Sequence, residues 1–476
     1  MASGSTSNRV FLDVEVTYVI YPKDGVDKNQ TVMIAEKLRA HALPSTLYTS
    51  QTERVGINFW LAKLSHKSAD LLAVELANEI ASIYPQLATD GYNPRYDTFD
   101  QTIAITYQDK PEPPDTIIDH LVFVCQQKGK SLQEYQGRYY YDNADPLPGR
   151  DVPVYIIDTG ANLDHKEFDQ VRDQVEWLHV GQDVDGHTAK DDSSTDPNQD
   201  LNTSSYLGKA HGTSMLSLVT GARMGVSKGV KPYLVRMPRR VIPGHAGGNR
   251  TGKPTNEDWL EGISKVNDHL IGRSTETKAI LLLAIHVPRS SFERDGKDCS
   301  LGFDGRMRFL LNDLVSKGVL PITGAGNDRT NTIDGLPANY GRRDKPIPEL
   351  LVVGGVDSMS FDLNSQTDFG QGLPHIFAPS SGVKCADGNH SLWGLRRIDN
   401  TYRSATSSSC AAAITVGLAA YFLRLAQIGR LKIDMSPLGL KNYILSDNLK
   451  WSRKDHFGRE LPAIWNGVEL PESGSS

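Results

Sequence analysis

The sequence predicts an α/β fold built on a mainly parallel sheet with helices on both faces, preceded by a small α+β domain. From residue 153 onward, short apolar runs typical of strands alternate with segments of helical apolar spacing. Strands that are apolar throughout are typical of parallel sheets covered on both faces. Before them, from Val10 to about Gln86, strand-like and helical segments alternate on a smaller scale, which predicts a compact α+β unit.

The α+β unit is expected to span residues 9–107. Its predicted elements are a strand at 10–22, a helix at 29–43, a strand at 55–64 and a helix at 68–83. The stretch that follows at 109–115 is rich in proline and charged residues. We therefore assign residues 108–138 to a linker or processing region.

The larger α/β domain is expected to span residues 139–468. Its predicted strands lie at 152–158, 232–237, 278–287, 319–326 and 349–357, and its predicted helices at 211–222, 257–270 and 306–318.

Composition and charge exclude several classes of function. The 476 residues carry a net charge of −6 at pH 7, which gives no reason to expect nucleic acid or an anionic membrane as a partner. No apolar run approaches the roughly 20 residues of a membrane-spanning helix. Asp13 and Glu15 interrupt the apolar start, so no secretory signal is visible and an intracellular location is one expectation. Four cysteines lie far apart without a CxxC pair, so they do not settle the compartment.

Two predicted strands lead into polar residues at the sheet edge where functional groups of open α/β proteins gather. Asp158 ends the strand 152–158, and Asn327 lies in the glycine-rich turn after the strand 319–326. His211 begins a predicted helix. With a serine, these residues supply an orienting carboxylate, a general base, an amide donor and a nucleophile, the set that acyl transfer by a serine triad requires.

The serine candidates lie in the run SATSSS at 404–409, directly before a strongly apolar segment. The run is therefore placed at the N-terminus of a buried helix. One or two hydroxyls suffice to cap the first N–H groups of a helix, so the run holds more than capping requires. A serine there also lies at the positive end of the helix dipole, which favours a nucleophile and a developing oxyanion.

From Tyr139 to about Gly467, these motifs resemble those of the subtilisin-like serine proteases (subtilases), of fungal type. The chain order Asp, His, Ser is the subtilisin order. The stretch VYIIDTG resembles the family's Asp motif, HGTSMLSLVTG its His motif and ITGAGND its oxyanion asparagine turn. VTYVIYPKD and GINFWLAKLSHKSADLL, in the N-terminal unit, resemble the family's inhibitory propeptide.

The resemblance implies a subtilisin-like fold with a ferredoxin-like propeptide domain, and a serine endopeptidase present here as a zymogen. The residues it implies are a triad of Asp158, His211 and Ser409, with Asn327 as oxyanion donor. It further implies a polypeptide substrate, the chain's own N-terminal domain as inhibitor and a monomer. If a signal has been removed, it implies a secreted or vacuolar location.

Ser409 is the preferred nucleophile because aligning the apolar helix with the family's places residues 407–409 over its Gly-Thr-Ser motif. Taking Ser407 instead would add two residues to the helix and turn its apolar face by about 200° at 3.6 residues per turn. Ser407 stays the alternative. Ser408 is expected to make mostly local hydrogen bonds, and Cys410 to be a buried apolar residue.

Two departures from the family pattern leave other functions open. Ser407 stands where the family has glycine, and residues 284–291 replace its usual substrate-binding strand. The alternatives are a catalytically impaired, peptide-binding relative and a peptide ligase or macrocyclase that uses the same triad. No cofactor is expected to be required and no metal ligands are assigned. The aspartate-rich loop 183–200 departs from calcium-loop spacing, so structural calcium is left unassigned.

Overall fold

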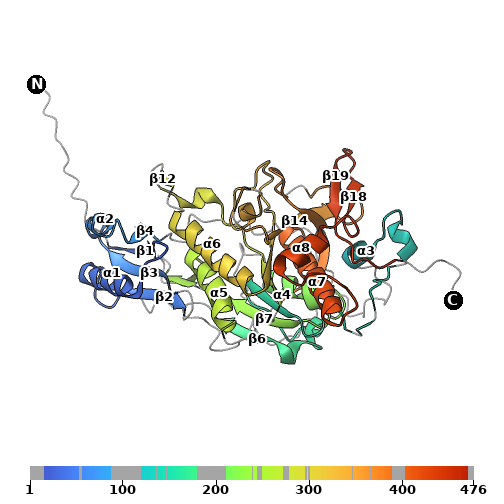
Figure 1. Ribbon diagram of the computed structural model, residues 1–476, viewed down its shortest axis with the longest axis horizontal. Helices are drawn as coiled ribbons and strands as arrows, with labels where there is room; N and C mark the ends of the chain where they lie inside the picture. Colours follow the sequence, from blue (N-terminus) through green and yellow to red (C-terminus); the bar gives the residue numbers. More distant parts are fainter. Residues whose placement is uncertain are drawn as a thin grey trace, which may run out of the picture.

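Two sheets organise the protein in a computed structural model (Figure 1). One is a nine-stranded, mainly parallel sheet and the other a four-stranded antiparallel sheet; three two-stranded ladders accompany them among the described residues. The described residues are 15–52, 56–86, 119–135, 137–142, 144–145, 147–179, 211–237, 240–243, 249–252, 254–271, 278–294, 297–298, 301–342, 344–345, 347–364, 367–388 and 402–469.

The nine-stranded sheet confirms the predicted parallel architecture. In order across the sheet, its strands are β18 (Trp451–Lys454), β19 (Glu460–Ala463), β15 (Ile376–Ser381), β14 (Leu351–Asp357), β13 (Val319–Gly324), β10 (Ala279–Leu283), β5 (Pro153–Asp158), β7 (Lys231–Arg236) and β6 (Glu176–His179). All neighbours pair in parallel except β18, which is antiparallel to β19 at one edge. The carboxyl ends of the parallel strands therefore meet at one edge of the sheet.

Helices cover both faces of this sheet, as its apolar strands require. One face packs against α3 (Asp119–Cys125), α4 (His211–Thr220), α7 (Ser408–Gln427) and α8 (Pro437–Ile444). The other packs against α5 (Asn256–His269) and α6 (Leu301–Ser316). The short ladders are β8 (Arg240–Pro243) with β9 (Asn249–Gly252), β11 (Glu293–Arg294) with β12 (Lys297–Asp298), and β16 (Val383–Ala386) with β17 (Tyr402–Ala405).

The N-terminal unit has the predicted ferredoxin-like arrangement. Its elements follow the chain order β1 (Val16–Pro22), α1 (Lys28–His41), β2 (Tyr48–Thr52), β3 (Gly56–Leu64), α2 (His66–Glu75) and β4 (Ile80–Pro85). One face of the small sheet packs on α1 and α2. The opposite face, through Tyr21, Phe59 and Leu61, joins the apolar core that contains α5 and α6. These two helices therefore lie between the two sheets (Figure 1).

The predicted helix at 68–83 is wrong in its second half. The helix α2 ends at Glu75, and after a turn the strand β4 begins at Ile80. Asn78 lies in that turn, and the residues that follow are rich in isoleucine and tyrosine, which favour strands. The strand β2 was not predicted. The domain boundaries near residues 107 and 138 stay predictions.

The helix α7 is the central element of its side of the core. Within the described part of the chain, it is the one helix long and apolar enough to cross a membrane by length and composition, and 89% of its apolar window is buried inside the protein. The expectation that no apolar run approaches this length is therefore wrong. The run is long because the helix is surrounded by protein on nearly every side.

Candidate active site

Asp158 and His211, the first predicted pair of site residues, are in direct contact. His211 Nδ1 lies 2.9 Å from Asp158 Oδ1 and 2.8 Å from Oδ2. Asp158 ends β5 and His211 begins α4, 53 positions later in the chain. Both are buried, with 4% of Asp158 and 2% of His211 exposed. A carboxylate at Nδ1 holds the proton on that nitrogen, so Nε2 carries the lone pair and is the atom suited to accept a proton.

The turn after β5 fixes the start of α4. Thr159 Oγ1 accepts the N–H of Gly212 at 3.0 Å. Gly160 has a φ of +116°, a conformation that favours glycine. A Cβ atom on Gly212 would lie 2.0 Å from the Gly160 carbonyl oxygen, so no larger residue fits. The two glycines let α4 approach β5 closely enough for the imidazole to reach the carboxylate.

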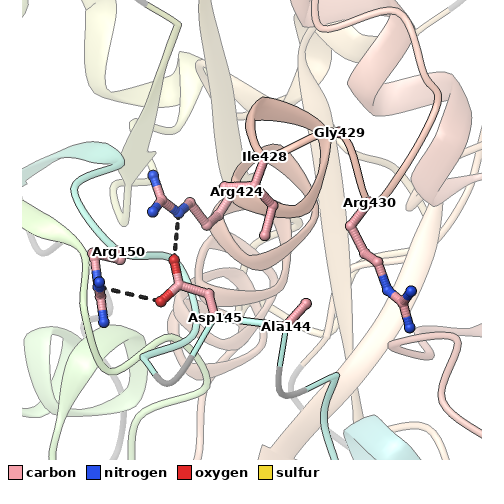
Figure 2. Close-up of a pocket in the computed structure, with 7 residues that line it drawn as sticks. All are labelled: Ala144, Asp145, Arg150, Arg424, Ile428, Gly429 and Arg430. Carbon is pink, nitrogen blue, oxygen red and sulfur yellow. Dashed lines mark hydrogen bonds and ion pairs between the residues drawn. The ribbon is translucent and has the colours of Figure 1, made fainter.

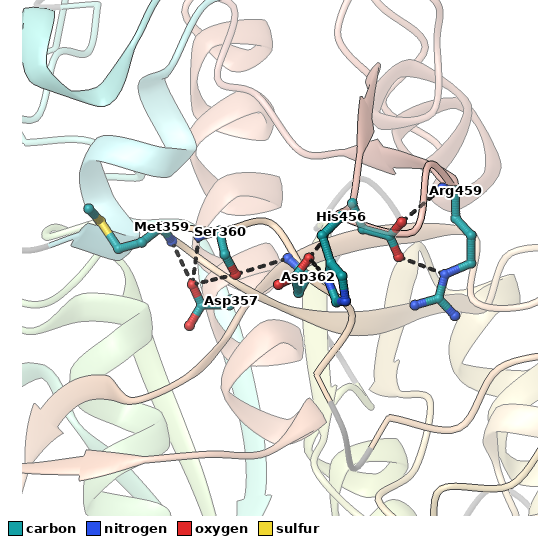
Figure 3. Close-up of polar contacts among 7 residues, drawn as sticks. Asp357, Met359, Ser360, Asp362, His456 and Arg459 are labelled. Carbon is teal, nitrogen blue, oxygen red and sulfur yellow. Dashed lines mark hydrogen bonds and ion pairs between the residues drawn. The ribbon is translucent and has the colours of Figure 1, made fainter.

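Burial distinguishes this pair from a second His–Asp pair at the surface. His456 hydrogen-bonds Asp362 there (Figure 3). Of those two side chains, 58% and 32% are exposed, against 2% and 6% for His211 and Asp158. Hydrogen bonds from His456 lower the pKa of Asp362 below its ordinary value. Water screens such exposed pairs, whereas a buried pair acts in a medium of low dielectric. Of the two, the buried pair is the one suited to catalysis.

Asn327 lies in the turn after β13 and holds the start of α7. Its Oδ1 accepts the backbone N–H of Ser408 at 2.8 Å, which makes Nδ2 the donor end of the amide. The Ser408 hydroxyl accepts the N–H of Gly326 at 3.2 Å. The expectation that Ser408 bonds mostly locally is therefore wrong. Its hydrogen-bond partners lie 81 and 82 positions away in the chain. These bonds can form because β13 packs closely on the start of α7: a Cβ on Gly324 would lie 2.6 Å from the Ser408 hydroxyl.

The serine run forms the first turn and cap of α7. Ser407 is the N-cap, and its hydroxyl accepts the N–H of Ser409 at 2.9 Å. Ser407 is fully buried, while 7% of Ser409 is exposed. Cys410 is buried, as predicted. Ser407 therefore fills the capping role that competed with catalysis for the hydroxyls of this run.

These hydrogen bonds join the predicted residues in two pairs, Asp158 with His211 and Asn327 with the start of α7. The strands β5 and β13 flank β10, and all three run parallel. Asp158 and the turn that carries Asn327 consequently emerge at the same sheet edge, on either side of the end of β10. The helices α4 and α7 pack in one core on one face of the sheet.

A pocket of about 440 Å³ lies at the other end of α7 (Figure 2). Asp145 receives a 2.6 Å hydrogen bond from Arg424 Nε, and Arg150 Nε lies 3.2 Å from the same carboxylate. The pocket is lined by Ala144, Asp145, Arg150, Arg424, Ile428, Gly429 and Arg430. Since Asp145 draws together two of the arginines, we interpret this network as an anchor between the end of α7 and the segment that precedes β5.

One polar cluster near the same sheet edge was not predicted. His286, Asp328 and Asp368 each place a potential ligand atom within 4.8 Å of the others. Asp328 directly follows Asn327, which was the only signal in the sequence. The three come from separate loops, so spacing along the chain could not reveal them. The loop 183–200, considered for calcium, lies outside the described residues.

Comparison with protein families gives a match to the subtilase family over residues 149–456. Among curated proteins, the chain is 23% identical over 324 residues to a cuticle-degrading serine protease of Orbilia oligospora, covering 68% of this chain and 60% of that protein. It is 25% identical over 334 residues to subtilisin-like protease 2 of Pseudogymnoascus destructans, covering 69% and 64%. The chain thus spans somewhat less than two thirds of the length of these relatives.

Among solved structures, the epidermin leader peptide processing serine protease of Staphylococcus aureus aligns with a TM-score of 0.60 at 12% identity, covering 95% of this chain and 98% of that one. Fervidolysin from Fervidobacterium pennivorans, a keratinolytic enzyme related to subtilisin, aligns with a TM-score of 0.56 at 14% identity, covering 97% and 62%. At such identities the likeness concerns the fold alone.

Proposed function

The chain belongs to the subtilase family, and from this premise we propose that it is a serine endopeptidase with a triad of Asp158, His211 and Ser409. The observation that carries the proposal is the buried contact of 2.8 Å between His211 Nδ1 and Asp158. In a family that cleaves peptide bonds, a buried imidazole oriented by a carboxylate at the sheet edge is the part that generates the nucleophile.

In the proposed reaction, Ser409 Oγ attacks the scissile carbonyl carbon while His211 Nε2 takes the hydroxyl proton. His211 then gives this proton to the leaving amine as the C–N bond breaks and an acyl-enzyme remains. Water, deprotonated by the same nitrogen, releases the acid product. Asp158 keeps the imidazole in the required tautomer and stabilises its charged form.

Asn327 is proposed to donate from Nδ2 to the oxyanion of the tetrahedral intermediate. Its Oδ1 is held by the N–H of Ser408, which supports this role because the amide cannot rotate without breaking a 2.8 Å hydrogen bond. Fixed donors need little reorganisation in the transition state, and removing one commonly costs about 100-fold or more in rate.

We also propose that the N-terminal unit inhibits the enzyme until it is cleaved off, as a propeptide does. Its support is the contact with α5: the Tyr21 hydroxyl donates to Glu257 at 3.1 Å, and Asn58 Nδ2 donates to Ser264 at 2.8 Å. N-terminal sequencing of the purified chain tests this proposal. The intact chain should lose its N-terminal unit with time, and the Ser409→Ala variant should keep it.

Labelling of the full chain by a fluorophosphonate tests the triad itself. Label should be lost in Ser409→Ala and His211→Ala and kept in Ser407→Ala. Loss in Ser407→Ala with retention in Ser409→Ala would move the nucleophile to Ser407. Product analysis, as a free acid or a new amide, separates a protease from the ligase alternative.

One observation favours a second candidate, a catalytically impaired relative that binds peptides. The backbone N–H of Ser409 is proposed as the second donor to the oxyanion, beside Asn327. In the structure this N–H donates to the Ser407 hydroxyl. If the chain is never labelled by the fluorophosphonate but binds a peptide without cleaving or joining it, this second candidate holds.

A further inference from the structure

The cluster formed by His286, Asp328 and Asp368 combines one imidazole with two carboxylates. His286 follows β10, Asp328 follows β13 and Asp368 precedes β15, so three loops deliver them to the same region. His286 Nε2 lies 3.2 Å from Asp328 Oδ2. One potential ligand atom from each residue lies within 4.8 Å of the other two.

Asp368 is a buried residue, and only one of its two carboxylate oxygens accepts hydrogen bonds from the described residues. Its side chain is 1% exposed. Oδ1 accepts hydrogen bonds from Asp328 N at 3.2 Å, Thr330 N at 2.7 Å and Thr330 Oγ1 at 2.9 Å. Oδ2 accepts none from the residues that the structure describes. Burying a carboxylate is costly unless its charge is balanced, so the Asp368 side chain calls for a positively charged partner.

Two glycines place this oxygen and the imidazole next to each other. A Cβ atom on Gly326 would lie 2.1 Å from Asp368 Oδ2 and 3.1 Å from His286 Cε1. On the other side, a Cβ on Gly335 would lie 2.0 Å from His286 Cε1. The absence of side chains at both positions gives room for the His286 ring and the Asp368 carboxylate, and the close packing holds them in place.

We propose that His286, Asp328 and Asp368 bind a divalent transition-metal ion such as Zn²⁺. Imidazole suits zinc, cobalt and similar ions, whereas calcium and magnesium prefer sites made of oxygen alone. A divalent charge balances the two carboxylates, with the imidazole neutral. Three protein ligands leave room for water or a substrate group on the ion.

The ion would also hold the turn that carries Asn327, because its ligand Asp328 is the next residue in the chain. This consequence rests on the proposed protease function, but the binding of the ion does not. If the chain binds the ion but is not labelled by the fluorophosphonate, the protease function is disproved and the metal site still stands.

The test is titration of the full, chelator-treated chain with Co²⁺ and Zn²⁺. We expect one Co²⁺ per chain with visible d–d absorption, displaced by Zn²⁺, and the same stoichiometry by calorimetry. His286→Asn and Asp368→Asn should each weaken binding by about 100-fold or more. His286 and Asp328 are partly exposed ligands, so their variants serve if Asp368→Asn, at the buried ligand, does not fold. Thermal unfolding in the presence of chelator checks the folding of each variant.

The surface pair of His456 and Asp362 provides the matched control, because it also joins an imidazole to a carboxylate. His456→Asn and Asp362→Asn should bind Co²⁺ as the unmodified chain does. The proposal is overturned if no Co²⁺ binds with d–d absorption, if binding survives in all three variants of the His286, Asp328 and Asp368 cluster, or if the control variants abolish it.

Discussion

The backbone N–H of Ser409 donates a 2.9 Å hydrogen bond to the hydroxyl of Ser407, two positions earlier in the chain. This bond caps α7, whose first N–H groups lack partners within the helix. In the proposed reaction the same N–H would turn to the oxyanion of the intermediate. The cap and the oxyanion therefore compete for one donor, and the residue responsible stands where the family has glycine.

Replacing Ser407 by glycine should accelerate acylation of Ser409. Removing the hydroxyl releases a donor whose hydrogen bond has a net worth of about 0.5–1.5 kcal/mol, so we expect a gain between about 2-fold and 10-fold. The free energy of unfolding should fall by only a few tenths of a kcal/mol, because glycine is tolerated at N-cap positions. The rate constant of fluorophosphonate labelling, measured beside thermal unfolding, checks both effects.

The control for this prediction is Ser407→Ala, which also removes the hydroxyl but costs about 1 kcal/mol of stability as a poor cap. Both variants should label faster than the unmodified chain. If both label more slowly, the Ser407 hydroxyl positions Ser409 and does not compete with the oxyanion.

Asp158→Asn should abolish most activity with little change in shape. An amide at this position favours the wrong tautomer of His211 and cannot stabilise the imidazolium, so we expect kcat to fall by about 10,000-fold. Peptide hydrolysis normalised to folded protein is the measurement. Asp362→Asn, in the exposed His–Asp pair, is the control and should leave kcat unchanged. An Asp158→Asn variant that retains a tenth of the activity would remove Asp158 from the triad.

The sequence predicted five of the nine strands of the main sheet, β5, β7, β10, β13 and β14, because these are continuous apolar runs. The strands β6, β15, β18 and β19 were not predicted. The strand predicted at 152–158 is β5 at Pro153–Asp158, and that predicted at 319–326 is β13 at Val319–Gly324. Asp158 and His211 were predicted as partners and do make contact. The short strand β2 was missed because its polar residues lack the apolar alternation that signals a half-buried strand.

Contacts between distant loops were beyond sequence reasoning. The bonds of Ser408 to the turn at 326–327 depend on how closely α7 packs on β13, which no local pattern encodes. The cluster at His286 likewise depends on the strand order β15-β14-β13-β10, which brings three separate loops together. Strand order is set by packing of the whole chain, so it is not written in any one segment.

Two substitutions of Asn327 separate its structural role from its proposed role in catalysis. Asn327→Asp keeps an oxygen that can accept the N–H of Ser408 but loses the amide donor. We expect kcat to fall by about 100- to 1,000-fold with a small change in stability. Asn327→Ala should lose the same activity and, in addition, about 1 kcal/mol of stability as the Ser408 bond is lost. Full activity in Asn327→Asp would show that the side chain only holds α7.

The contact between the N-terminal unit and α5 should weaken as pH rises. Burial raises the pKa of the Glu257 and Glu261 carboxyls above their ordinary value of 4.5, and the nearby Asp258 charge adds to both shifts. The hydroxyls of Tyr21 and Tyr48 donate to these carboxyls. When the N-terminal unit dissociates, the two carboxyls are exposed to water and their pKa returns to the ordinary value. Dissociation therefore releases protons from Glu257 and Glu261.

The sign of the pH effect follows from linkage: the stability of this contact is fully present below the ordinary pKa and is lost as pH rises through the raised pKa. We expect hydrogen exchange of β1 and β3 in the full-length Ser409→Ala chain, corrected for intrinsic rates, to show less protection at about pH 7 than at about pH 4. In Glu257→Gln with Glu261→Gln, glutamine keeps an acceptor oxygen without a charge, so protection should no longer depend on pH over this range. Protection that rises with pH in the unsubstituted interface, or a pH dependence that persists in the double variant, would mean that other groups control the contact.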